Sequence, residues 1–237
     1  PDLRNSGKSD EAKTKMGYCF GQDIYHTMEM LHDKYGKNNF ILYGFSQGGM
    51  GSAIAAKMFS NELRKKGIKV EKIILDSSIS NVRKRVKQDA AKRRVPKFIV
   101  SVVTRVFNLR VGNKLDKLKL SYLLKRIPTL IIQSKNDKAT TYGMLMEEYN
   151  DIAQYKNIYL RVFEKGSHTR VYPEYKEEYT EAVVKFLKGE LDENSFIVNN
   201  DENIEKIEQT KTDRGSLNKN EEKETGDYEN FSDFDYE

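Results

Sequence analysis

A serine, an aspartate and a histidine that could together perform acyl transfer lie at three separated points of the 237-residue chain. Ser46 lies within the pentapeptide Gly-Phe-Ser-Gln-Gly at 44–48, Asp137 ends the stretch Ser-Lys-Asn-Asp, and His168 follows Gly-Ser. A serine hydroxyl is a poor nucleophile at neutral pH, so it needs a base within hydrogen-bond reach, and that base needs a partner that fixes its tautomer. These three residue types supply those needs.

The pentapeptide is a G-x-S-x-G motif between a strand pattern and a helix pattern. Residues 39–44 form a short apolar run that ends in glycine, and residues 47–65 have the apolar periodicity of a helix. In this context Gly44 and Gly48 let the serine occupy a tight turn that raises its hydroxyl above the carboxyl edge of the sheet. The Gln47 amide then lies at a helix N-terminus, where it can donate to a developing oxyanion. Taken alone, the motif also fits a small-residue turn that permits close helix packing.

Three further apolar runs repeat this strand pattern. Each is rich in β-branched or aromatic residues and apolar on both faces, which is typical of strands in a buried parallel sheet. Helical patterns separate them, and this alternation predicts an α/β fold with a mostly parallel sheet flanked by helices. The further strands are expected at 70–75, 128–133 and 158–163, and the further helices at 21–34, 141–154 and 172–188.

The chain order serine, aspartate, histidine, with each residue after a predicted strand, resembles the α/β-hydrolase family. The opening loop at 2–9 is similar to the family's D-x-R-G-x-G-x-S loop, with Asn5 in place of a glycine. The likeness runs from Asp2 to Leu187. It implies the α/β-hydrolase fold, with Ser46 as nucleophile and the Gln47 amide as an oxyanion donor.

The resemblance further implies that His168 acts as general base and then general acid, and that Asp137 orients it. Two other acids lie at comparable places, since Asp76 also ends a strand and Glu164 is near the histidine in sequence. Asp137 is preferred because it has the family's spacing after the penultimate strand.

The remaining histidines are expected to be ordinary surface or boundary residues, and the single cysteine is expected to be a buried structural thiol. His26 and His32 lie on an early predicted helix, and no predicted turn presents Cys19 as a nucleophile. One cysteine excludes an internal disulfide framework, and the scattered histidines lack metal-ligand spacing. No metal and no cofactor are expected.

Charge divides the chain into segments. The net charge is +5, but the acidic tail at 189–237 holds sixteen Asp and Glu against five Lys and Arg, a net of −11. The insert at 77–126 holds fifteen Lys and Arg against two Asp, a net of +13. We therefore expect a basic helical cap at 77–126 between the core segments 1–76 and 127–188, and a disordered tail that either folds back on the cap or solubilises the protein.

The cap is the main clue to partners. Its dense basic run precedes an apolar stretch at 98–107, which suits an anionic membrane surface with an acyl group buried beneath. A solvated basic face over a packed cap core is the alternative. Nucleic-acid binding is not expected, because interleaved aromatic residues and a recognition-helix signature are missing.

The resemblance implies that the first four strands of the sheet, and the loop with a second oxyanion donor, precede Asp2. We expect the chain to be the C-terminal part of a larger hydrolase, to expose a hydrophobic sheet edge, and to be inactive and poorly soluble alone. Because it starts at Pro1 without a methionine, the sequence is compatible with a signal or anchor upstream of Pro1. A cytoplasmic and a peripheral-membrane location both fit.

The expected function is a serine hydrolase that cleaves carboxylic esters or thioesters through a Ser-His-Asp triad and an acyl-enzyme, with lipid-derived acyl compounds among the substrates. Two alternatives remain: an amide hydrolase similar to serine aminopeptidases, and a non-catalytic binding protein with the same fold.

Overall fold

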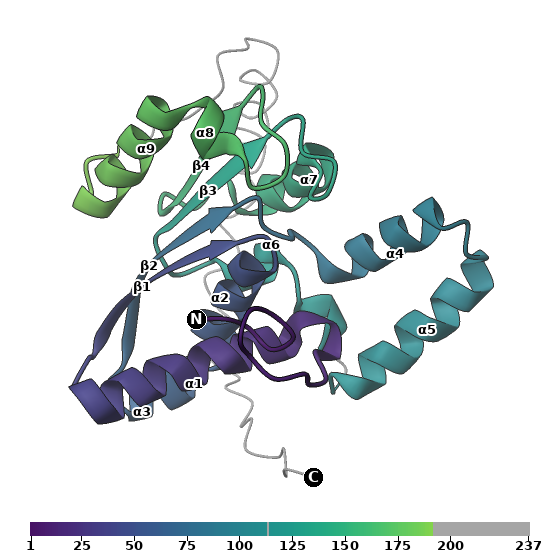
Figure 1. The fold of residues 1–237 in the computed structure, drawn as a ribbon, viewed down its shortest axis with the longest axis horizontal. Coiled ribbons are helices and arrows are strands. Elements are labelled where there is room, and N and C mark those ends of the chain that lie inside the picture. Colours follow the sequence, from purple (N-terminus) through teal and green to yellow (C-terminus); the bar gives the residue numbers. More distant parts are fainter. Residues whose placement is uncertain (113, 192–237) are drawn as a thin grey trace, which may run out of the picture. The chain divides into compact units, whose positions relative to one another are not determined.

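The structure, a computed structural model, describes residues 1–112 and 114–191 (Figure 1). Four strands form one parallel sheet in the order β1-β2-β3-β4. They are β1 (Asn39–Phe45), β2 (Lys69–Asp76), β3 (Thr129–Ser134) and β4 (Ile158–Phe163). The predicted strands are therefore confirmed to within one residue at each end.

Helices connect the strands and cover the sheet. They are η1 (Lys15–Gly17), α1 (Tyr18–Tyr35), α2 (Gln47–Met58), α3 (Ser60–Lys65), α4 (Val82–Lys92), α5 (Lys97–Arg110), η2 (Leu115–Lys117), α6 (Leu120–Leu123), α7 (Tyr142–Ile152), α8 (Val171–Glu174) and α9 (Lys176–Lys188).

Two predicted helices are each divided in two. The helix expected over 47–65 breaks at Phe59, whose ring stacks on Tyr25 of α1 with the ring centroids 5.0 Å apart. The helix expected over 172–188 breaks at Tyr175, where the backbone leaves helical geometry and the ring packs on Phe163 of β4. In both places an aromatic side chain that packs into the core coincides with the interruption.

The alternation of side chains along each strand produces two cores, one on each face of the sheet. On one face Leu75, Ile131 and Leu160 pack into a large cluster with α1, α2, α6 and α7. On the other face Ile74 and Ile132 pack with α8 and α9. β3 is buried along its whole length, because it lies between two strands and under both layers.

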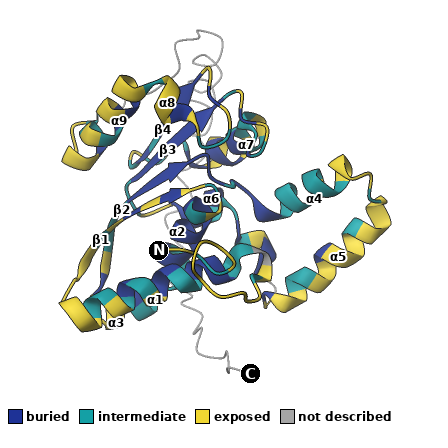
Figure 2. Cartoon of the chain, in the orientation of Figure 1, coloured by how far each residue is buried: buried dark blue, intermediate teal, exposed yellow. Residues whose placement is uncertain are grey.

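β1 lies at the edge of the sheet, and among the described residues it pairs with β2 alone. Leu42 and Gly44 are buried, whereas the side chains of Ile41, Tyr43 and Phe45 are exposed. Figure 2 shows this mixture of buried and exposed residues along β1. The predicted hydrophobic edge is therefore present. In the described part of the chain, one face of this strand also carries exposed apolar side chains.

The predicted cap region contains α4, α5 and α6. The alternative of a packed core in its apolar stretch is wrong for α5, because of its fourteen residues Thr104 alone is buried. The buried apolar residues of the region lie instead at the start of α4 and after α5, and they join the main core: Val82, Val111, Leu115, Leu118, Leu120, Leu123 and Leu124. Most of the predicted tail, from residue 192 onward, lies outside the described residues.

The opening loop adopts the backbone that its motif demands. Asn5, at the position where the related loop has glycine, takes a φ of 63°, and asparagine tolerates this left-handed region better than most residues. Arg4 anchors the loop to α1 through an ion pair with Asp23 at 2.5 Å. No helix in the described part of the chain has both the length and the apolar character needed to cross a bilayer.

Candidate active site

Ser46 occupies a strained turn between β1 and α2. Its φ of 50° and ψ of −112° lie outside the regions that serine ordinarily adopts, at a cost of about 1–3 kcal/mol. The Ser46 amide donates to the Asp76 carbonyl at 2.9 Å, which continues the β1–β2 ladder up to the turn. The surrounding hydrogen bonds therefore hold the serine in a conformation that it would not take alone.

Close approach of β1 and α2 depends on two glycines. A Cβ on Gly44 would lie 2.4 Å from the Gly48 carbonyl oxygen and 2.5 Å from the Gly49 nitrogen. A Cβ on Gly49 would lie 2.7 Å from the Ser78 hydroxyl oxygen. A Cβ on Gly48 would meet nothing within 4 Å. Gly44 has the expected steric role, but among the described residues the expectation that Gly48 shares it is wrong, and Gly49 has that role instead.

The structure brings Ser46, His168 and Asp137 together. His168 Nε2 lies 2.8 Å from Ser46 Oγ, and His168 Nδ1 lies 2.8 Å from Asp137 Oδ2. All three follow the carboxyl ends of parallel strands: Ser46 follows β1, Asp137 follows β3 and His168 follows β4. Residues that are 122 positions apart in sequence thus meet at one edge of the sheet.

The Asp137 carboxylate is enclosed by hydrogen-bond donors. Its Oδ1 accepts from the amides of Ala139 and Thr140 at 2.8 and 2.9 Å, and its Oδ2 lies 2.8 Å from Thr140 Oγ1. Burial alone would raise the pKa of Asp137, but the hydrogen bonds from His168 and Thr140 outweigh it and hold the pKa below its usual value. Asp137 therefore stays ionised beside the histidine.

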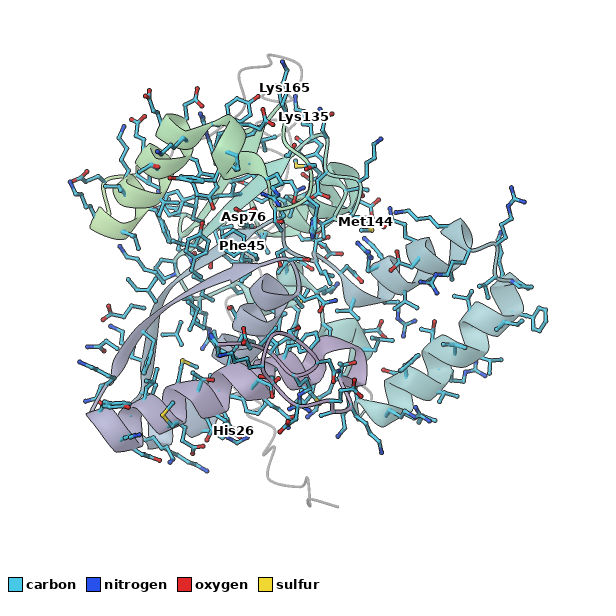
Figure 3. All side chains as sticks on the ribbon, in the orientation of Figure 1. His26, Phe45, Asp76, Lys135, Met144 and Lys165 are labelled. Atoms are coloured by element: carbon cyan, nitrogen blue, oxygen red, sulfur yellow. The ribbon has the colours of Figure 1, made fainter. Side chains whose placement is uncertain are left out.

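Asp76 is buried at the end of β2 but does not contact His168 through a hydrogen bond. Its carboxylate accepts from the Tyr179 hydroxyl at 2.6 Å and from the Ser77 hydroxyl at 2.8 Å, and the Tyr43 hydroxyl contacts that of Tyr179. Burial raises the pKa of Asp76, and these hydrogen bonds oppose the rise. Figure 3 shows Asp76 beside Phe45, its partner in the β1–β2 register.

The other residues considered from the sequence lie apart from this cluster. Glu164 is exposed and forms an ion pair with Lys135 at 2.6 Å. His26 lies on α1, distant from Asp76 in Figure 3, and its Nδ1 is 3.0 Å from Glu29. His32, near the end of α1, lies 2.7 Å from Asn38 Oδ1. Cys19 is a buried free thiol.

The Gln47 amide is the first N–H of α2, one of the groups that a helix leaves without an intrahelical acceptor. A cavity of about 270 Å³ borders Gln47. Its lining is mixed: Phe20, Met50, Ile79 and Val82 are apolar, whereas Arg4, Asn5, Ser6 and Thr14 are polar. A larger cavity of about 670 Å³ runs along the outer edge of β1 from Phe40 to Ser46. In the described part of the chain, no group of three or more His, Cys, Asp or Glu residues could hold a metal ion.

Two positioning residues were missed from the sequence. Thr140 Oγ1 lies between Asp137 Oδ2 and the Ser77 carbonyl oxygen, 3.0 Å from the latter. The Ser77 hydroxyl accepts from the Thr169 amide at 3.2 Å, next to His168. The Asp-x-x-Thr spacing at 137–140 was a usable signal, because aspartate commonly bonds backbone amides two and three residues ahead. Ser77 carries no such signal.

Comparisons with known proteins agree with this architecture. A family profile for the α/β hydrolase fold matches residues 1–202. An esterase from Pyrococcus furiosus is similar at 20% identity and a TM-score of 0.57, covering 79% of this chain and 68% of that chain. A lipase-esterase related protein from Clostridium acetobutylicum is similar at 18% identity and a TM-score of 0.51, covering 78% and 81%. A thermophilic esterase has 22% identity and a TM-score of 0.50, with 79% of each chain covered. No curated protein matches.

Proposed function

Because the chain belongs to the α/β-hydrolase family, we propose that it is a serine hydrolase that cleaves carboxylic esters or thioesters through an acyl-enzyme. The observation that carries the proposal is the continuous hydrogen-bonded chain from Ser46 through His168 to Asp137, with both links at 2.8 Å. A histidine that bridges a strained serine and a buried carboxylate is the arrangement that activates a serine hydroxyl.

In the proposed acylation step, Ser46 Oγ attacks the carbonyl carbon while its proton passes to His168 Nε2. Asp137 accepts from His168 Nδ1, which fixes the tautomer and stabilises the imidazolium that forms. The negative charge that develops on the carbonyl oxygen is stabilised by the Gln47 amide and the N-terminus of α2. When the tetrahedral intermediate collapses, His168 returns the proton to the leaving alcohol or thiol, and the acyl group stays on Ser46.

Deacylation repeats the sequence with water. His168 takes a proton from the water molecule, the hydroxide attacks the acyl carbon, and the proton returns to Ser46 Oγ as the acid leaves. The apolar part of the cavity beside Gln47, made by Phe20, Met50, Ile79 and Val82, supports an acyl group as the part of the substrate bound there. The ester preference is supported by the fold likeness to the esterases named above.

A fluorophosphonate probe tests the proposal, because it labels a serine only where the hydroxyl is activated. Because the chain alone is expected to be inactive, the probe is applied to the intact gene product that contains it, and we expect labelling at Ser46, identified by mass spectrometry of the modified peptide. Ser46→Ala should lose the label, while the exposed Ser60 on α3 offers the matched control Ser60→Ala, which should keep it. An intact, folded protein that never labels would favour a binding protein over an enzyme, whereas equal labelling after Ser46→Ala would show that another serine is the nucleophile.

A further inference from the structure

The second helix of the cap region, α5, carries a large unpartnered apolar surface. Phe98, Val102 and Leu109 are 71%, 60% and 66% exposed, and three more apolar side chains are also exposed: Ile99, Val103 and Val106. With the 3.6-residue period of an α-helix, these six side chains fill one continuous arc of about 140°. Figure 2 shows α5 as exposed along most of its length. An apolar arc of this kind is unfavourable in water and marks an interaction surface.

The same segment is entirely basic in its charge. Residues 90–115 contain no Asp or Glu, and they include Lys92, Arg93, Arg94, Lys97, Arg105 and Arg110. In the described part of the chain none of these six forms an ion pair with a carboxylate. The basic residues at the start of α4 differ, since Arg83 pairs with Asp116, Lys84 with Glu147 and Arg85 with Asp89. Unpaired positive charge is thus concentrated at the α4–α5 turn and on α5.

We propose that α5 and the α4–α5 turn form a docking surface for a lipid bilayer that contains anionic lipids. A helix with an apolar arc beside Lys and Arg lies in the plane of the interface, with its apolar side chains among the acyl chains and its cations among the headgroups. We define this docking surface as residues 92–110.

Charge and apolar character together favour the bilayer over other occupants. A second copy of this chain would bring two strongly basic surfaces together, which like-charge repulsion opposes. A nucleic acid would match the charge but leave the arc of Phe98, Val102 and Leu109 in water. The acidic residues 192–237 would also match the charge, yet they hold five Ile, Leu and Val in 46 positions, too few to cover the arc.

Residues of α4 anchor the proposed docking surface beside the candidate active site. Lys84 on α4 is 3.1 Å from the buried Glu148 carboxylate, and Arg85 donates to the Ala139 carbonyl. Lys92 donates to the Lys138 carbonyl at 3.2 Å. These carbonyls belong to the two residues that follow Asp137, so a bilayer bound at this surface is mechanically linked to the loop that carries the aspartate.

Vesicle sedimentation of the full chain tests the proposal. We expect binding to vesicles of phosphatidylcholine with phosphatidylserine, weak binding to phosphatidylcholine alone, and a decrease with added salt. Phe98→Ser with Leu109→Ser should weaken binding at least ~10-fold, since each removes an exposed apolar side chain that the bilayer would bury. Arg93→Glu with Arg94→Glu should abolish the preference for phosphatidylserine. All four positions are exposed, and a thermal melt verifies that each variant is folded.

Matched controls come from exposed residues elsewhere. Val184→Ser with Leu187→Ser on α9, 41% and 39% exposed, removes two apolar side chains, and Lys37→Glu with Lys165→Glu reverses two charges. Both control variants should bind like the unmodified chain. Equal loss in the controls, or full binding by the Phe98→Ser, Leu109→Ser variant, would overturn the proposal. Binding that rises with salt would overturn it too, because residues 192–237 would then be the occupant.

Discussion

Replacing Gly44 with alanine tests whether close packing of β1 on α2 builds the serine turn. The added Cβ would lie 2.4 Å from both the carbonyl carbon and the carbonyl oxygen of Gly48, and 2.5 Å from the nitrogen of Gly49. All three are backbone atoms of α2, so no side chain can rotate away and the helix must shift from the strand.

The expected magnitude follows from overpacking. Inserting a methyl group into a closely packed contact costs typically 1–3 kcal/mol, and an obstacle made of backbone belongs at the upper end, about 3 kcal/mol. For a domain of this size each kcal/mol lowers the melting temperature by roughly 2–4 °C. Gly44→Ala should therefore lower the melting temperature by about 6–12 °C, and labelling of Ser46 by a fluorophosphonate should fall with it.

Gly48→Ala is the matched control, because it adds the same methyl group four residues further on, where it meets nothing within 4 Å. Gly48 lies in the first turn of α2, and alanine is the better helix former there. Its melting temperature should be unchanged or slightly higher. The reasoning is refuted if Gly44→Ala melts within about 2 °C of the unmodified chain, or if Gly48→Ala is the more damaging of the two.

Three other predictions address the acid. Asp137→Asn should reduce labelling of Ser46 by ~10³–10⁴-fold, as in serine proteases, whereas Asp76→Asn should reduce it less than ~10-fold; the reverse order would make Asp76 the acid. Thr140→Val removes one hydrogen bond to Asp137 and should slow labelling of Ser46 ~10-fold. The loss should be greatest at low pH, because without this hydrogen bond the pKa of Asp137 rises and the carboxylate is protonated sooner. Thr180→Val, at an exposed threonine on α9, is the control. Because the pKa of Asp137 is lowered in the folded state, its carboxylate stabilises the fold fully at pH values above the unfolded pKa of 3.8, and this stabilisation is lost as pH falls through the folded pKa. The free energies of unfolding in urea of the chain and of Asp137→Asn should therefore approach each other as pH falls from 3.8 through the folded pKa. A difference between them that stays constant with pH would contradict this.

The sequence was sufficient for the strands and for the order of the site residues. Strand patterns depend on local composition, and parallel strands place their carboxyl ends at one edge, so Ser46, Asp137 and His168 could be expected to converge. Two features were beyond its reach. The exposure of the apolar residues of α5 could not be predicted from composition, because it depends on whether another element packs against the helix. The unequal roles of Gly48 and Gly49 depend on which Cβ would point at Ser78, and that direction is set by how α2 packs in the folded protein.

The end of β2 is what joins the three loops of the candidate site, and this explains why an acid there need not act on the histidine. The Asp76 carbonyl accepts from the Ser46 amide at 2.9 Å, and the Ser77 amide donates to Ile132 of β3 at 3.0 Å. The Ser77 carbonyl lies 3.0 Å from the Thr140 hydroxyl, and its own hydroxyl accepts from the Thr169 amide.

Ser77 makes these contacts in a left-handed backbone conformation, with a φ of 51°, which is costly for serine. The hydrogen bond from its hydroxyl to Asp76 at 2.8 Å, and that from Tyr179 at 2.6 Å, use both carboxylate oxygens. Asp76 thus stabilises the strained segment at the end of β2, residues 76–77, which is hydrogen-bonded to the serine, aspartate and histidine loops. The Asp76 carboxylate accepts from two buried hydroxyl groups, whereas the hydrogen bond to His168 is made by Asp137. The geometry therefore separates a positioning acid at β2 from the acid at Asp137 that contacts the histidine.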